Sequence, residues 1–291
     1  MITLRCRLAV SFFVLIAGMN VPPTRCLAED STLPPVIQYS LFLGTLDRLE
    51  PQSITVALEE YIGRFSDAEE KDAAEAHRLF RAFYSETAHR LSESVLGYGE
   101  MLSGKDLDKR KTGAGDYRRY GLSICADEVG YFFKEDKMFL IRAAAVTTGD
   151  YGDYARYMAE EGDDRVFVEG GLTIPWDSLR LRIINLEAFA RTHPGLSETD
   201  SVIRPMLKRC LAFYLRGGIN THAYDRAGAI DPELHASYER FLEDNRESSY
   251  HNLIGRVYDV LEKNGFMKCD ELAALLESEE MGGMIHYQPM Y

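Results

Sequence analysis

The chain has 291 residues, of which 46% are hydrophobic, and its formal net charge is -13 at pH 7. This length suffices for one large domain or two small ones with a proper core. The acidic surplus excludes partners that need a basic face, namely nucleic acids and anionic lipids. It would suit a basic protein partner through electrostatic steering, although a well-solvated surface is the simpler meaning of the charge.

The first 28 residues are typical of a secretory signal peptide. Arg5 and Arg7 precede an apolar stretch over 8–19, which is shorter than the ~20 residues of a membrane span. Cys26 and Ala28 supply the small residues of a cleavage site before Glu29. We therefore expect a periplasmic or secreted protein of 263 residues, since 28 are removed from 291, with no transmembrane segment in the mature chain.

Three helices are expected in an N-terminal helical hairpin region over 29–97. The first covers 36–49 and the second begins at Ser53. A capping box of Ser66 and Glu69 then opens a long helix to about Leu96. The second helix has apolar residues on one face of a 3.6-residue period, at Ile54, Leu58, Tyr61, Ile62 and Phe65.

The middle of the chain has weaker patterns. Residues 98–118 are rich in glycine, lysine and aspartate, which predicts an exposed loop or a linker between domains. The segment 119–133 fits a short buried turn, an extended stretch or a helix. Helices are expected at about 135–146 and 151–161, followed by an extended or looping segment from Asp163 to Pro175 that bends at Gly170–Gly171.

A C-terminal domain over 119–280 ends in a series of helices, before a flexible tail at 281–291. One helix begins at Trp176, and a second runs from Ser197 to Gly217–Gly218, where glycines end it. After a loop, Asp231 and Pro232 start a third helix as N-cap and first-turn proline. Two more helices are expected over 249–264 and 270–277.

These helices contain an internal match at a constant offset of 52 residues. The matched pairs are Glu187/Glu239, Phe189/Phe241 and Ser197/Ser249. Such a match is typical of helical repeats, in which each unit buries its face against the next. Patterns of alternating Val, Ile and Thr are nearly absent. The sequence therefore predicts an all-α fold of helical hairpins stacked in a repeat-like, irregular solenoid.

The junction 186–197 (LEAFARTHPGLS) resembles the helix–turn–helix junction of tetratricopeptide-like proteins of the bacterial envelope. The resemblance covers 176–264, and the 52-residue offset departs from the 34-residue period of that family. It implies a scaffold for protein binding or assembly, and no catalytic residue comes with it.

Three cysteines remain after signal cleavage, which allows one disulfide. Cys210 falls on the apolar face of its helix and is best explained as a buried small hydrophobe. Cys125 and Cys269 are then the pair that would form a disulfide.

Catalytic and metal-binding patterns are sparse. His89 and Glu93 share a helix face, as do His235 and Glu239, but this spacing usually gives a surface pair rather than a metal site. The sequence has no HExxH, CxxC, GxSxG or phosphate-binding glycine loop. We therefore expect no metal, no cofactor and no catalytic residue.

Two irregular segments are the candidates for a contact surface, because aromatic-bearing loops beside a helical array often bind partners. They are 166–176, which holds the single tryptophan, and 220–225. Their candidate binding residues are Glu169, Trp176, Asn220, His222, Tyr224 and Asp225. In the alternative, Trp176 fills a seam between helices and the loop is a connector.

Three functions follow from these patterns. The first is a periplasmic scaffold or adaptor that binds a protein and has no catalytic activity. The second is an acidic inhibitor or immunity-type protein that neutralises a basic exported effector. The third is an enzyme that acts on the cell wall or a glycan with carboxylates, a possibility that 46 acidic residues leave open.

Overall fold

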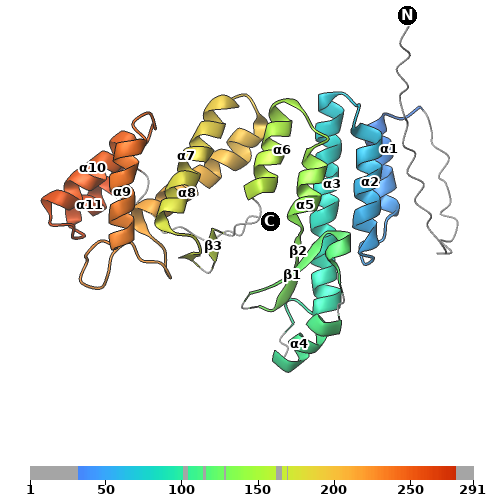
Figure 1. The fold of residues 1–291 in the computed structure, drawn as a ribbon, viewed down its shortest axis with the longest axis horizontal. Coiled ribbons are helices and arrows are strands. Elements are labelled where there is room, and N and C mark those ends of the chain that lie inside the picture. Colours follow the sequence, from blue (N-terminus) through green and yellow to red (C-terminus); the bar gives the residue numbers. More distant parts are fainter. Residues whose placement is uncertain are drawn as a thin grey trace, which may run out of the picture.

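The computed structural model describes residues 32–100, 104–113, 116–127, 129–161, 166–168 and 170–279. The expected signal peptide (1–28) and tail (281–291) lie outside the described residues. Most of the helices stand side by side in one elongated row that follows the order of the sequence (Figure 1). The prediction of an all-α fold is confirmed.

Among the described residues, the first half of the row contains six α-helices and one β-hairpin. Its elements are α1 (Pro35–Thr45), α2 (Gln52–Phe65), α3 (Glu70–Leu91), the π-helical η1 (Ser92–Leu96), α4 (Gly104–Gly113), the 3-10 turn η2 (Arg118–Tyr120), β1 (Leu122–Ala126), β2 (Tyr131–Glu135), α5 (Lys137–Ala144) and α6 (Gly149–Glu161).

In the part of the chain that the structure describes, the second half has five α-helices. Its elements are β3 (Phe167–Val168), β4 (Gly171–Leu172), α7 (Trp176–Thr192), the π-helical η3 (Thr199–Ile203), α8 (Arg204–Arg216), α9 (Pro232–Asp244), α10 (His251–Lys263) and α11 (Asp270–Ser278). Asp231 caps α9 as expected, because its carboxylate accepts the backbone N–H groups of Glu233 and Leu234.

The expected capping box before α3 is wrong. Ser66 ends α2, and its hydroxyl donates to the carbonyl of Ile62 at 2.6 Å. Glu69 is the N-cap residue of α3 and makes no side-chain capping bond. A hydroxyl that bonds back to its own helix cannot serve the next one, so α3 begins without this cap.

The expected loop at 98–118 also needs correction, because α4 lies within it. The hydroxyl of Tyr131 donates to the Asp108 carboxylate at 2.9 Å, which ties α4 to strand β2. The sequence left three alternatives for 119–133. The structure shows a hairpin there, in which β1 pairs antiparallel with β2. The charged sequence of α4 has no apolar period that would predict a helix.

The buried side chains form two hydrophobic cores. The first runs from Tyr39 to Ala159 and the second from Val166 to Leu276. Tyr154 of α6 packs against both. The first core draws residues from both sides of 98–118, so the described cores divide after α6 and not at that segment.

The first core is built largely of aromatic rings. Tyr61 lies at its centre, with ring centroids 5.9 Å from Phe80 and 6.0 Å from His77. His77 in turn lies against Tyr151 of α6. Buried rings of this size and spacing add directional packing to a large apolar area, and so join α2, α3 and α6.

The second core contains the matched helices α7 and α9. Phe189 and Phe241 are both buried, as expected. The matched glutamates, however, have different partners. Glu187 accepts from the hydroxyl of Ser248 at 2.6 Å, across to the turn after α9, whereas Glu239 accepts from Tyr258 of α10 at 3.2 Å. The matched positions therefore share burial of their rings but not their polar contacts.

The expected disulfide is absent, because Cys125, Cys210 and Cys269 are all free thiols. Cys125 lies in β1, on the first half of the row, whereas Cys269 packs against the second core. Cys210 is 3% exposed, as expected of a small core residue. Burial raises the pKa of its thiol to about 12, so it remains protonated. Among the described helices, none combines the length and hydrophobicity needed to cross a bilayer.

Candidate functional site

The two irregular segments singled out from the sequence lie side by side. The backbone N–H of Asn220 donates to the carbonyl of Gly170 at 3.1 Å. The hydroxyl of Thr221 accepts the N–H of Leu172 at 2.8 Å. We call the β3–β4 hairpin together with the loop 217–230 the double-loop surface. It projects from the same edge of the row as β1, β2 and α4 (Figure 1).

Glycines let the loop leave α8 and lie flat on the hairpin. Gly217 ends α8 with φ 72° and donates its N–H to Phe213 at 2.7 Å. At Gly218, a Cβ atom would overlap the carbonyl oxygen of Gly170 and the ring of Phe213. A larger residue at Gly218 would therefore push the loop away from the hairpin.

The loop has two turns. The first turn, 217–222, is closed by the pairing of Gly217 with His222. The second turn, 225–229, is organised by Asp225, whose carboxylate accepts the N–H groups of Ala227 and Ala229 at 2.8 and 2.9 Å. The Asp225 carboxylate therefore stabilises its own turn.

The remaining predicted site residues have different surroundings. Trp176 is 4% exposed and packs against Phe213 and Tyr214, so its indole belongs to the second core. Asn220 and His222 are exposed on the first turn. The indole of Trp176 therefore packs beneath the double-loop surface, whereas the side chains of Asn220 and His222 lie on it.

Tyr224 faces inward between the two turns. Burial raises the pKa of its phenol above the usual value. Its hydroxyl is buried, and within the described part of the chain it has no hydrogen-bond partner. Glu169 lies outside the described residues. The structure thus brings Asn220, His222, Tyr224 and Asp225 together on one loop, with Trp176 below.

Sequence reasoning missed Ile219, which is 77% exposed and so the most exposed large hydrophobic residue described. Its Cβ lies 3.4 Å from the Cβ position at Gly170. It also missed Arg209, whose guanidinium lies 5.0 Å from the ring centroid of Phe167 in β3. A single isoleucine gives no periodic signal, so only the fold shows that it lies outside.

A charged network beneath the surface fixes α7 to α9. Asp177 accepts from Arg180 at 2.7 Å and from Arg240 of α9 at 2.8 Å. Arg180 is buried and also donates to the side-chain oxygen of Asn245 at 2.8 Å. The hydrogen bonds from Arg180, then Arg240, lower the pKa of Asp177 to about 2 despite its partial burial. The carboxylate is therefore ionised at neutral pH and holds the helices under the double-loop surface.

Among the described residues, no group of three or more His, Cys, Asp or Glu side chains could hold a metal ion. His89 and Glu93 are 3.6 Å apart and both exposed, and His235 and Glu239 are 3.7 Å apart. These are surface pairs of small energetic effect.

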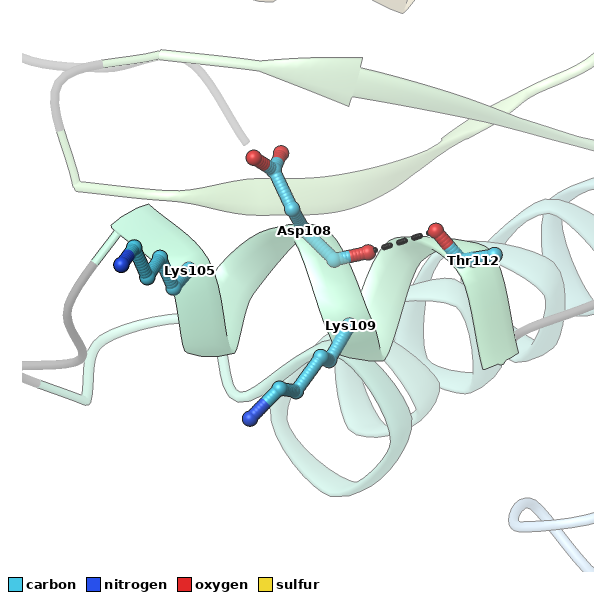
Figure 2. Close-up of a pocket in the computed structure, with 4 residues that line it drawn as sticks. All are labelled: Lys105, Asp108, Lys109 and Thr112. Atoms are coloured by element: carbon cyan, nitrogen blue, oxygen red, sulfur yellow. Dashed lines mark hydrogen bonds between the residues drawn. The ribbon is translucent and has the colours of Figure 1, made fainter.

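A shallow, open pocket lies over α4, lined by Lys105, Asp108, Lys109 and Thr112 (Figure 2). Asp108 points toward the hairpin, where its carboxylate binds Tyr131, and its carbonyl accepts from Thr112 at 2.8 Å. The acid of this pocket therefore serves to hold α4. An open site of this kind lacks the enclosed, convergent polar groups of a small-molecule site.

Comparisons with protein-family models, with curated protein sequences and with solved structures give no match.

Proposed function

We propose that the protein is a helical scaffold that binds a protein partner through the double-loop surface and works without catalysis in the periplasm or outside the cell. The single observation that carries this is Ile219. Its side chain is 77% exposed on a loop that backbone hydrogen bonds hold against a second loop. An exposed apolar side chain on a fixed platform can be buried by a partner without the cost of ordering the loop.

The platform supports the proposal in a second way. Ordering a mobile loop on binding costs free energy, and a preformed surface avoids much of that cost. Here Thr221 and Asn220 tie the first turn to the hairpin, and Phe213 and Trp176 fill the space below. The surface is thus suited to bind with little rearrangement.

The experiment is quantitative capture from envelope extract with the tagged protein. Ile219→Asp should reduce capture of a defined partner at least about tenfold, because it places a charge at the centre of the contact. The matched control is Leu41→Asp on α1, since Leu41 is 55% exposed at the far end of the row. Equal capture by both variants, or loss with Leu41→Asp alone, would reject the double-loop surface.

A further inference from the structure

Residues 281–291 differ in composition from the rest of the chain. None of these eleven residues is Asp, Glu, Lys or Arg, whereas 27% of the whole chain is charged. Six of the eleven are apolar, namely Met281, Met284, Ile285, Tyr287, Met290 and Tyr291. An uncharged segment of this kind gains free energy by covering other apolar surface.

Helix α11 starts this segment close to the second turn of the double-loop surface. Arg256 pairs with Glu279 and so ties the end of α11 to α10. Because α11 has nine residues, its two ends are ~14 Å apart. Met267 lies three residues before α11 and forms an antiparallel bridge with Ala229 of the turn. The segment therefore begins about one short helix away from Met267.

The segment is also long enough to reach the double-loop surface. Eleven extended residues span at most ~36 Å, which exceeds the ~14 Å needed to return along α11. Gly282 and Gly283 allow the chain to reverse direction, because glycine adopts both signs of φ. The exposed Ile37 and Leu41 of α1 lie at the opposite end of the row (Figure 1), and each packed helix in between adds ~8–10 Å. The double-loop surface is the nearer of these two apolar surfaces.

A strained backbone holds Met267 outside. Among the described residues, Phe266 is the one non-glycine residue with a left-handed backbone, at φ 58°. Its ring packs inward, with its centroid 4.0 Å from that of His235, and the next side chain, Met267, is 37% exposed. Such conformations persist where the surrounding structure holds them, and they gather at functional sites. Met267 and the 77% exposed Ile219 thus give each turn of the loop one exposed apolar side chain.

We propose that residues 281–291 fold back onto the double-loop surface and cover Met267 and Ile219, so that the chain occupies its own binding surface until a partner displaces the segment. This inference rests on the proposed function and adds the regulation of that surface. A short tether keeps the segment at a local concentration on the order of mM. Weak apolar contacts then suffice to hold it, and a partner that buries more apolar area replaces it.

Charge favours contact within one chain over contact between two copies. Each chain carries a formal net charge of -13, so two copies repel one another as they approach. The uncharged segment meets no such repulsion when it folds back on its own chain. The proposed occupant is therefore the segment of the same molecule.

The test is photocrosslinking within the purified mature chain at micromolar concentration. A benzophenone side chain at position 219 or 267 should crosslink to the peptide 281–291, identified by mass spectrometry, and one at position 41 should not. Ile285→Asp should lower the yield at least about fivefold, because it places a charge in the apolar contact. The matched control Gln288→Asp adds the same charge at a polar position of the segment and should lower the yield less than about twofold.

Four results would overturn the inference. These are no crosslink to 281–291 from either position, an equal crosslink from position 41, an equal loss with Gln288→Asp, and a yield that falls on tenfold dilution. A loss on dilution would mean that the segment comes from a second copy.

Capture from envelope extract separates this inference from the proposed function. Ile285→Asp should raise capture of the partner several-fold, because the segment no longer competes for the surface. Capture that falls with Ile219→Asp but ignores Ile285→Asp keeps the proposed function and removes the regulation. A crosslink within the chain, together with capture that ignores Ile219→Asp, keeps the contact of the segment and removes the proposed function.

Discussion

Among the described residues, the buried polar side chains of the first core are neutral, whereas the second core also buries two arginines, Arg180 and Arg182. In the first, His77 lies 2.9 Å from the hydroxyl of Tyr151, and Tyr39 donates to the carbonyl of Ala57 at 3.0 Å. In the second, the buried Arg180 meets Asp177, and Arg182 meets Glu161 at 2.5 Å. Neighbouring helices can thus be joined in two ways. The first core uses aromatic rings and their hydroxyl groups, and the second also uses ion pairs between arginine and carboxylate side chains.

The irregular segments differ in the same two regions. The β1–β2 hairpin is drawn into the first core by Tyr84, whose hydroxyl donates to the carbonyl of Gly121 and accepts from Asp136 N–H at 2.9 Å. The loop 217–230 buries Ala223 and Ile230 in the second core, and its first turn is held by backbone bonds and Thr221. Attachment through the backbone leaves side chains such as Ile219 outside, which is why we place binding on the second region.

The largest expected effect comes from removing one ring in each core. Phe80→Ala and Phe241→Ala should each lower the free energy of unfolding by ~3–5 kcal/mol, because both rings are fully buried. Urea unfolding followed by circular dichroism measures the loss. The single tryptophan, Trp176, lies in the second core, so its fluorescence should change earlier in Phe241→Ala than in Phe80→Ala. A cost under ~1 kcal/mol for either would contradict its place in a core.

Acid should weaken the first core before the second. Burial, followed by the nearby Arg81 and Arg78, lowers the pKa of His77 from 6.5 to about 3. Between these values the unfolded chain binds a proton that the folded chain does not, so stability falls as pH falls through this window, by ~5 kcal/mol at most. Asp177, lowered from 3.8 to about 2, loses its contribution only below 3.8.

Thermal unfolding at pH 7 and near pH 4.5 checks this order. At the lower pH, loss of helix by circular dichroism should precede the change in Trp176 fluorescence. A variant His77→Gln should show a smaller fall in midpoint between the two pH values. Identical pH dependence in the variant and the parent would contradict the role of His77.

The next effect concerns the ion pair under the double-loop surface. Asp177→Ala should cost ~1–3 kcal/mol, because it removes the carboxylate 2.7 Å from the buried Arg180 and leaves it with the more distant Asp244, at 3.7 Å. Asp200→Ala is the matched control, since Asp200 pairs with Arg204 at i, i+4 and both side chains are exposed. It should cost less than ~1 kcal/mol. Chemical denaturation measures the free energy of unfolding of both variants. Equal losses would mean that the burial of Arg180 does not matter.

Gly218→Ala tests the contact between loop and hairpin. The added methyl group would overlap Gly170 and Phe213, so we expect ~1–3 kcal/mol of destabilisation and weaker partner capture. At Gly195, nothing lies within 4 Å of an added Cβ, so Gly195→Ala should be near neutral. Thermal midpoints of the two variants give the comparison, and equal midpoints would mean that the loop does not rest on the hairpin.

The smallest effect is expected from Thr221→Val. This change keeps the shape of the side chain but removes the hydroxyl that accepts the N–H of Leu172, at a cost of ~1 kcal/mol. Hydrogen exchange of the Leu172 amide should accelerate, while exchange in α1 remains as before. An unchanged Leu172 amide would show that this bond does not hold the two loops together.

Periodicity predicted most of the fold, since α2, α7, α8 and α10 have apolar faces that recur every helical turn. It missed α4, which has no such face, and it misplaced the cap of α3, because Ser66 had a nearer acceptor in Ile62. The pairing of Cys125 with Cys269 rested on counting thiols, which says nothing about distance. The missed helix and the cysteine pairing depend on contacts between residues far apart in the chain. A single sequence does not show these contacts.

The candidate site was only partly accessible to sequence reasoning. Broken periodicity indicated both irregular segments, and the structure places them in contact through Gly170 and Asn220. The pattern did not show which side chains face outward. Trp176 lies inside while Ile219 lies outside, a distinction that depends on how Gly217 and Gly218 direct the loop.

Site-specific photocrosslinking in the producing cells tests the central claim most directly. A benzophenone side chain at position 219 should give a discrete adduct with one protein, and the same group at position 41 should give none, although both positions are exposed. An adduct from position 41 but not from position 219, or equal adducts from both, would contradict binding through the double-loop surface.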